Sequence, residues 1–295
     1  LGATRSNEII AEVAKATANE LKNLGINMNL APVVDVNNNP DNPVIGVRSF
    51  GEDPELVAEF SSIYIKKLEE NGIIACAKHF PGHGDTDLDS HLNLPVIKHS
   101  KERLDEVELL PFKRAIKTGV DSIMSAHVYF PAIENDIGVP ATLSRKVLTS
   151  LLREELAYKG VIVTDCMEMR AIADSYGSVE GAVQAISAGS DIILISHSYK
   201  RQKRAIKAAV EAVKANRIQE QRIDKSVKRI LKLKEKRISL SNYEKADYKK
   251  INFAENKKIA KKAAQKGITV VKGEEIISEL ADNISQNQLG VLDFE

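Results

Sequence analysis

The chain has 295 residues, of which 43% are hydrophobic and 28% are charged, so its composition allows a substantial buried core. Its 42 basic and 41 acidic side chains nearly balance, which gives no charge footprint for nucleic acid or an anionic membrane. No apolar run is long enough to span a bilayer. Two cysteines, Cys76 and Cys166, are too few for a disulfide framework, and we expect reduced, buried thiols.

The N-terminal segment, LGATRSNEII, has neither an initiator Met nor a signal-peptide pattern. We therefore expect the sequence to begin within a longer gene. This leaves the compartment open, with the cytoplasm preferred over secretion or the cell wall. The oligomeric state is also left open.

Helical stretches alternate with short apolar strands along the first 236 residues. The expected helices cover residues 6–24, 54–71, 102–118, 144–157, 179–188 and 200–236. The expected strands cover residues 26–35, 73–78, 121–126, 161–165 and 191–195. This alternation is typical of parallel βαβ units, and strands that are apolar throughout are expected when both faces of a sheet are covered.

Both a doubly wound sheet and a TIM barrel fit five such units. The polar residues favour the barrel, because they lie at the C-terminal ends of several different strands: Asp35, Lys78, His79, His127 and Asp165. A doubly wound fold would more often carry a Gly-rich phosphate loop after its first strand, and none is found. We therefore predict an α/β chain of the TIM (β/α)8 type.

A second domain is expected to begin near the C-terminus. Residues 237–252 are polar and charged, which is typical of a linker. They are followed by an expected helix at 253–266 and by two apolar segments, GITVV at 267–271 and LGVLDF at 289–294. The predicted organisation is a barrel over 1–236, a linker over 237–252, and the start of an α/β sandwich domain over 253–295.

The densest group of chemically active residues is KHFPGHGDTDLDSH, residues 78–91. Its Pro and Gly residues predict a loop, and loops at strand ends concentrate function. His79 and His83 have a spacing that binds metal on a helix, but Pro81 and Gly82 break any helix between them, so we predict no metal site.

His91 and Asp89, in the same loop, are close enough in sequence to pair. A carboxylate on one imidazole nitrogen fixes the tautomer and favours the protonated ring, as a general acid/base requires. The alternative is a polar loop whose Asp and Ser side chains satisfy its own turns.

Two further residues have a functional and a structural interpretation. Asp165 ends the apolar run VIVT, where a carboxylate is costly unless it is paired or used. It could be a nucleophile, a cation ligand or a helix N-cap. Arg48 could pair with Glu52 or Asp53 on the surface, or bind ligand oxygen atoms through its rigid guanidinium fork.

These segments resemble glycoside hydrolase family 3, and within it the β-N-acetylglucosaminidase branch. The loop at 78–91 is similar to the acid/base loop of this branch, whereas the β-glucosidase branch keeps Lys-His-Phe without the Gly-His-Gly…Asp-Ser-His continuation. Further similar segments are LAPVVDVNNNP (30–40), RSFGEDP (48–54), SIMSAHVYFPAIE (122–134), PATLSRKVL (140–148), GVIVTDCMEMRAI (160–172) and, resembling the second domain, AAQKGITVVK (263–272).

The resemblance implies a role for each matching residue. Asp165 is implied as the nucleophile, with His91 as acid/base and Asp89 as its partner. The sugar-binding residues implied are Arg48, Lys78 and His79, and no metal or cofactor is implied. Family members begin with strands that carry an Asp-x-Glu-Gly-Gly motif, which is not found here, so we expect a barrel that lacks its first strands at the N-terminus.

The implied reaction is retaining exo-hydrolysis of terminal β-linked N-acetylglucosamine, from peptidoglycan fragments or chitooligosaccharides, through a covalent glycosyl–Asp165 intermediate. A histidine acid/base places no second anion near the incoming nucleophile, so a phosphorylase remains an alternative, as does a β-glucosidase of the same family. A non-catalytic carbohydrate-binding barrel would keep Arg48 and Lys78 but would not need the two carboxylates and His91 together.

Overall fold

The computed structural model describes residues 1–86, 94–238 and 246–269. Its α-helices are α1 (Asn7–Asn23), α2 (Pro54–Glu70), α3 (Lys101–Glu106), α4 (Leu110–Thr118), α5 (Arg170–Ala173), α6 (Ser178–Ala188), α7 (Tyr199–Lys214), α8 (Glu220–Arg237) and α9 (Phe253–Lys266). Its strands are β1 (Cys76–Phe80), β2 (Ser122–Ser125), β3 (Val161–Cys166) and β4 (Ile192–Leu194). Short 3-10 turns are η1 (Gly2–Thr4), η2 (Gly46–Arg48), η3 (Ala141–Leu143) and η6 (Tyr248–Lys250), and η4 (Lys146–Glu155) is π-helical.

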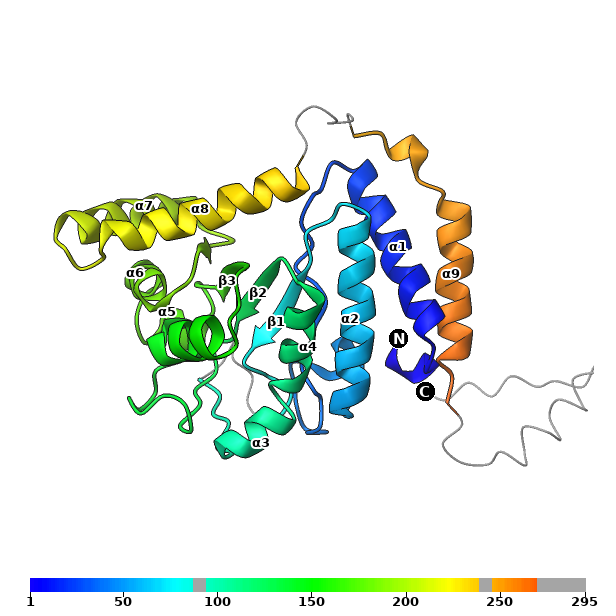
Figure 1. Ribbon diagram of the computed structural model, residues 1–295, viewed down its shortest axis with the longest axis horizontal. Coiled ribbons are helices and arrows are strands. Elements are labelled where there is room, and N and C mark those ends of the chain that lie inside the picture. Colours follow the sequence, from blue (N-terminus) through cyan, green and yellow to red (C-terminus); the bar gives the residue numbers. More distant parts are fainter. Residues whose placement is uncertain (87–93, 239–245, 270–295) are drawn as a thin grey trace, which may run out of the picture.

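The four strands form one parallel sheet in the order β1-β2-β3-β4, at the centre of Figure 1. Successive strands are neighbours, and Ile123 of β2 lies opposite Ala77 of β1 and Ile162 of β3. Because the strands are parallel, their C-terminal ends meet at one edge of the sheet. The predicted alternation of strands and helices is therefore confirmed for these four units.

The expected first strand, residues 26–35, is only partly formed. It runs beside β1 with two isolated parallel bridges, one from Met28 to Ile74 and one from Val33 to Lys78. Pro32 has no backbone N–H and cannot donate to a ladder at its own position. The segment still delivers Asp35 to the same edge of the sheet as the end of β1, because Val34 N donates to Lys78 O at 2.7 Å.

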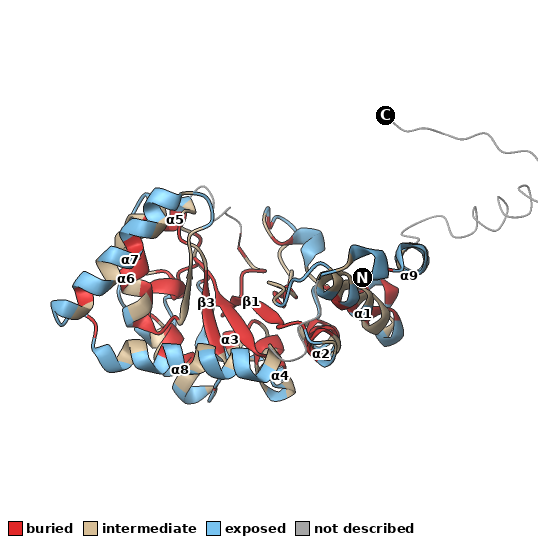
Figure 2. Ribbon diagram, turned by 90° about the horizontal axis from the view of Figure 1, so that it is seen from above, coloured by how far each residue is buried: buried red, intermediate tan, exposed pale blue. Residues whose placement is uncertain are grey.

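The core lies between the strands and the surrounding helices. Buried residues follow β1 and β3, while the outer surfaces of the helices are exposed (Figure 2). Phe80 of β1 meets Phe112 of α4 edge to face, with ring centroids 5.1 Å apart. Both rings are fully buried, so they anchor α4 to the sheet. Cys76 and Cys166 are both free, as predicted, but only Cys76 is buried. The prediction of a buried Cys166 is wrong, because that residue is half-exposed at the end of β3.

Two of the expected helices are each divided in two. The prediction of one helix over 102–118 is wrong, because Pro111 occupies the first turn of α4, where a missing N–H and a fixed φ are tolerated, and α3 ends before it. The prediction of one helix over 200–236 is also wrong. Asn216 adopts a left-handed conformation with φ 57°, which breaks the chain between α7 and α8.

The helix expected at 253–266 is present as α9, which lies beside α1 (Figure 1). Lys262 of α9 lies 3.0 Å from the carboxylates of both Glu8 and Glu12 on α1. The apolar segment at 289–294 and residues 270–271 lie outside the described residues, so the division into two domains stays a prediction. Within the described residues, no helix has the length and apolar character needed to cross a membrane.

Helix α8 is fixed to the N-terminal end of the sheet by ion pairs to buried carboxylates. Arg237 Nη2 lies 2.6 Å from Glu69 on α2, and Lys236 Nζ lies 2.8 Å from Asp121, which precedes β2. Arg237 also pairs with Asp121 through Nε. Burial, together with the adjacent Asp121 carboxylate, raises the pKa of Glu69 to about 7. The two acids therefore compete for the same pair of cations.

This raised pKa predicts a pH-dependent stability. The Glu69 carboxyl loses its proton at about pH 7 in the folded chain but at about pH 4.5 in the unfolded chain. The bound proton therefore favours the folded chain. This contribution to the free energy of unfolding is complete below pH 4.5 and is lost as the pH rises toward about 7. Relative to Glu69→Gln, the free energy of unfolding of the wild type should fall by roughly 1–3 kcal/mol across this range. Urea unfolding at a series of pH values measures the difference.

Glu70→Gln is the matched control, because Glu70 is the next residue and its partner is the exposed Lys67. Its curve should follow that of the wild type, since surface ion pairs contribute little to stability. Parallel curves for the wild type and Glu69→Gln would contradict the prediction.

Candidate active site

A cavity of about 240 Å³ opens at the C-terminal ends of β1, β3 and β4. It is lined by Leu30, Val44, Arg48, Lys78, His79, His83, Met124, Asp165, Cys166, Met169, Leu194 and Ser196. Four of the predicted site residues thus meet around one space, although they come from widely separated parts of the chain. The other two, Asp89 and His91, lie outside the described residues.

Asp165 is brought to the cavity by β3, one residue before that strand ends. Its Oδ1 accepts a hydrogen bond from the backbone N–H of Cys166 at 2.7 Å. Burial alone would raise the pKa of Asp165, but the neighbouring His79, His127 and Lys78, with the Cys166 N–H, hold that pKa below its ordinary value. The carboxylate is therefore ionised at neutral pH, in a largely enclosed position.

Lys78 and Arg48 supply positive charge to the same cavity. Burial lowers the pKa of Lys78, and the neighbouring guanidinium of Arg48 lowers it further. Arg48 ends the turn η2 and is exposed, with Nη1 donating to Val44 O at 3.2 Å. Asp53, its suggested surface partner, instead caps α2 by accepting from Glu55 N at 2.9 Å. The guanidinium therefore faces the cavity without an acidic partner among the described residues.

Asp35 was placed at a strand end by its sequence position, but that pattern gave it no role. Its side chain is completely buried, and Oδ2 lies 2.7 Å from His79 Nδ1. Its Oδ1 accepts from the backbone N–H of His79 at 3.1 Å and of His83 at 2.8 Å. Burial by itself would raise the pKa of Asp35, but these histidines outweigh it and the pKa is lowered. Asp35 thus fixes the orientation of the His79 ring.

His83 has a different environment from His79. It is almost completely buried, and this burial lowers its pKa to about 4, so its ring is neutral at neutral pH. Its Nδ1 lies 2.9 Å from Thr86 Oγ1, while the Nδ1 of His79 is engaged by Asp35. Each histidine therefore has its own partner within the protein, and the two do not face a common ligand position through these atoms.

Asn42 joins the two loops that border the cavity, and sequence analysis missed it. Its Nδ2 donates to His83 O at 2.8 Å, Gly84 O at 3.0 Å and Thr86 Oγ1 at 3.2 Å. Its Oδ1 accepts from the backbone N–H groups of Val44 and Ile45. A Cβ on Gly84 would lie 1.8 Å from Val36 O, so the close approach of these two segments requires glycine at position 84. Asn42 can make these bonds only because the two loops lie close together in the folded chain, which its own sequence does not indicate.

His127, which the sequence placed at a strand end, belongs to the core. It is 1% exposed, and its ring nitrogens lie 2.9 Å from Thr142 Oγ1 and 3.0 Å from Cys166 O. The second contact holds the backbone just after Asp165. His127 therefore holds the end of β3 in place through its contact with the Cys166 carbonyl.

Two groups of side chains among the described residues have metal-ligating atoms within 4.8 Å of one another: Cys166, Glu168 and His197, and Asp85, His99 and Glu108. In each, the protein already engages the carboxylates. Glu168 pairs with Arg201 and accepts from two backbone N–H groups, and Glu108 accepts twice from Arg103. Asp85 pairs with His99. These interactions account for both groups as internal ion pairs.

Comparison with known proteins gives a consistent set of relatives. Residues 1–233 match the glycosyl hydrolase family 3 N terminal domain. "Beta-hexosaminidase A" of Pseudoalteromonas piscicida is 40% identical over 255 residues, which are 80% of this chain and 43% of the relative. The chain spans about half the length of the curated relatives it matches, with 53% of the Neisseria meningitidis "Beta-hexosaminidase" covered.

Solved structures give the same result for the fold. A family 3 β-N-acetylglucosaminidase from Paenibacillus sp. str. FPU-7 superimposes with a TM-score of 0.86 at 48% identity, covering 92% of this chain and 52% of that one. A β-glucoside phosphorylase also superimposes with a TM-score of 0.86, at 26% identity, covering 92% of this chain and 50% of that one. The predicted α/β fold of TIM-barrel type is thereby confirmed.

Asn42→Ala should destabilise the chain, because it removes both the donors to the loop at 83–86 and the acceptor for Val44 and Ile45. Leaving such buried groups unsatisfied should cost about 2–4 kcal/mol of unfolding free energy. Denaturant unfolding measures the loss. Asn23→Ala is the control, since that amide makes a single hydrogen bond within α1, and it should cost less than about 1 kcal/mol. Equal losses for the two variants would refute a joining role for Asn42.

Proposed function

This chain belongs to glycosyl hydrolase family 3, and we propose that it carries the catalytic residues of a retaining β-N-acetylglucosaminidase. The observation that carries the proposal is the ionised Asp165 carboxylate at the end of β3, in a cavity that also contains Lys78 and Arg48. The relatives named as hexosaminidases and the Paenibacillus β-N-acetylglucosaminidase support the choice of sugar. Peptidoglycan fragments and chitooligosaccharides are the proposed substrates.

In the first step Asp165 attacks the anomeric carbon of the terminal N-acetylglucosamine. Its lowered pKa keeps the carboxylate ionised, as a nucleophile must be. The bond to the leaving oxygen breaks as the glycosyl–Asp165 ester forms, with net retention after the second displacement. Lys78, His79 and Arg48 line the same cavity and can donate to the sugar's oxygen atoms. His79 is held by Asp35, so its position is fixed before the sugar binds.

The proton for the leaving group is proposed to come from His91, with Asp89 as its partner. These two residues lie outside the described part of the chain, and their roles are carried from the motif at 78–91. The described part of that loop supports the assignment, because His83 lines the cavity and the buried Thr86 side chain contacts the His83 ring. In the second step neutral His91 takes a proton from water, and the resulting attack at the anomeric carbon releases Asp165.

A phosphorylase is the second candidate, because the chain superimposes closely on a β-glucoside phosphorylase. In that reaction phosphate, not water, would attack the glycosyl–Asp165 ester. The two candidates share the first step and differ only in the acceptor. Product analysis with and without phosphate therefore separates them, and β-glucoside against β-N-acetylglucosaminide substrates separates either from a β-glucosidase.

Asp165→Ala in the complete gene product should lower kcat for aryl β-N-acetylglucosaminides by about 10⁴-fold, because no glycosyl ester can form. A fluorinated N-acetylglucosaminyl donor with a good leaving group should leave its mass on the peptide that contains Asp165 in the wild type. Asp174→Ala, at an exposed position after α5, should keep full activity. Labelling on another carboxylate, such as Glu168 or Asp89, would show that the nucleophile is misassigned.

His91→Ala should affect substrates according to their leaving groups. Phenyl β-N-acetylglucosaminide, whose leaving group needs a proton, should react about 10²–10⁴-fold more slowly, while the dinitrophenyl substrate should lose less than about tenfold in the glycosylation step. Asp89→Ala should show a weaker form of the same pattern with KM nearly unchanged. Equal losses on both substrates, with a raised KM, would make His91 a binding residue instead.

A further inference from the structure

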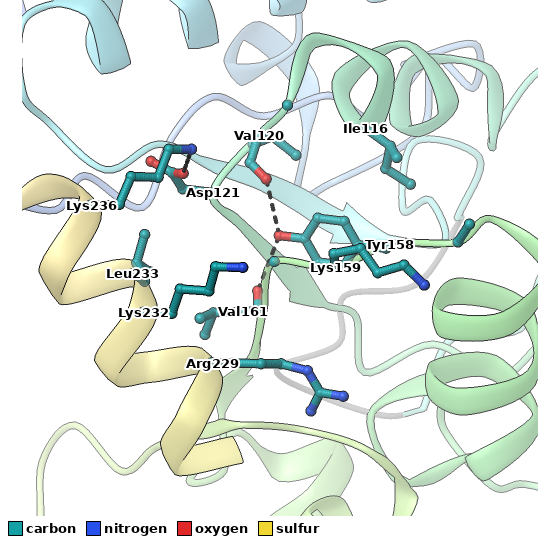
Figure 3. Close-up of a pocket in the computed structure, with 13 residues that line it drawn as sticks. Ile116, Val120, Asp121, Tyr158, Lys159, Val161, Arg229, Lys232, Leu233 and Lys236 are labelled. Atoms are coloured by element: carbon teal, nitrogen blue, oxygen red, sulfur yellow. Dashed lines mark hydrogen bonds and ion pairs between the residues drawn. The ribbon is translucent and has the colours of Figure 1, made fainter. Parts of the chain in front are cut away.

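A second cavity, of about 300 Å³, lies at the opposite end of the strands from Asp165 (Figure 3). Its walls are the residues just before β2, the loop Ala157–Gly160 just before β3, and one side of α8. The ring of Tyr158 is buried in this wall, with its hydroxyl 3.3 Å from the carbonyl oxygens of both Val120 and Val161. The catalytic proposal assigns nothing to this end of the sheet.

The lining of this cavity is strongly basic. Four of its side chains are cationic, Lys159, Arg229, Lys232 and Lys236, against a single acid, Asp121. Figure 3 shows Arg229 and Lys232 extending from α8 toward the loop that carries Lys159. Asp121 is already engaged by Lys236 and Arg237. Neither Lys159 nor Lys232 has an acidic partner in residues 1–86, 94–238 or 246–269.

Positive charge is also in excess directly beside the cavity. The side chain of Asp191 is completely buried and accepts from Arg153 through Oδ2 and from Arg229 through Oδ1 at 3.0 Å. A third guanidinium, that of Arg222, lies 3.6 Å from Oδ1. One carboxylate therefore faces three guanidiniums, which leaves two formal positive charges without a carboxylate. Arg229 carries part of this excess into the cavity wall.

The backbone adds unpaired donors to the same wall. No group in the described parts of the chain accepts a hydrogen bond from the backbone N–H of Lys159 or of Gly160, and both residues line the cavity. Two successive N–H groups without an acceptor, beside cationic side chains, can donate to the same anion. A concave, positively charged site with a low-dielectric wall also concentrates anions from solution.

We propose that this cavity is a binding site for a phosphoryl oxyanion, held by Lys159, Lys232 and Arg229 together with the N–H groups of Lys159 and Gly160. Guanidinium and ammonium groups form strong, charge-assisted hydrogen bonds with phosphate oxygens. The bound anion joins α8 to the loop before β3 without touching the reacting atoms at the other end of the strands. The proposal does not depend on the catalytic assignment.

Isothermal titration calorimetry on the full chain tests the site, at constant ionic strength in chloride. Inorganic phosphate and glycerol 3-phosphate are titrated separately. The double variant Lys159→Met/Lys232→Met should bind about tenfold or more weakly than the wild type, since each lost bond to a charged group weakens binding. Both positions are exposed, so neither substitution disturbs the core. Lys225→Met is the control, because it removes an exposed lysine of α8 that does not line the cavity.

Saturable binding that the double variant loses and Lys225→Met keeps would support the site. Equal affinity for both ligands would then show that the phosphoryl group alone is recognised. Tighter binding of inorganic phosphate would assign free phosphate, and tighter binding of glycerol 3-phosphate would assign a phosphomonoester. The proposal fails if neither ligand gives saturable heat, if the double variant binds like the wild type, or if Lys225→Met weakens binding as much as the double variant. Amide NMR shifts of Lys159 and Gly160 on adding phosphate would place the anion, and shifts confined to the cavity around Asp165 would overturn the assignment.

Discussion

The buried carboxylate of Asp35 is the interaction on which the arrangement of the active site depends. An ionised carboxylate without solvent exposure is costly unless donors surround it, and here the His79 ring and two backbone N–H groups supply them. Those donors belong to the end of β1 and to the loop that follows it. The carboxylate therefore holds the loop against the segment before it, and the loop cannot move away without leaving a buried charge unpaired.

This constraint explains why the residues around Asp165 can act together. Lys78 and His79 are adjacent in β1, and a strand turns adjacent side chains to opposite faces unless its regularity is broken. The register between β1 and β2 shifts between Lys78 and Phe80. Lys78 and His79 both line the cavity as a result, and Asp35 holds His79 there. The side chain of Asp35 thus stabilises the irregular end of β1.

The sequence predicted those features of the fold and site that local patterns encode. Apolar runs of five or six residues place the strands, and a polar residue next to the end of such a run is expected near the strand end. This located Asp165 closely, whereas β1 continues further than expected and so includes Lys78 and His79. The division of the helices was also encoded, by Pro111 and by Asn216, but a helical apolar period continues through both positions and obscured it.

The long-range polar contacts could not be predicted in the same way. Asn42 contacts residues 41 to 44 positions away, and Asp35 contacts residues 44 and 48 positions away. An Asn in a polar loop and an Asp after a strand are also common turn and cap residues, so nothing in their own sequence distinguishes them. Their roles follow only from the tertiary positions of two loops.

Basic and acidic side chains nearly balance over the whole chain, but they are distributed differently at the two ends of the sheet. Helix α8 alone has eight basic and three acidic side chains. The acids that it meets at the N-terminal end, Glu69, Asp121 and Asp191, have buried side chains, and Asp121 and Asp191 are each shared among several cations. At the C-terminal end the buried carboxylate of Asp35 and the half-buried carboxylate of Asp165 are matched by a few well-placed donors. This difference has a physical consequence, because the groups proposed to react lie only at the C-terminal end. Ion pairing or anion binding at the N-terminal end therefore acts on the stability of the fold and makes no direct contact with the reacting atoms.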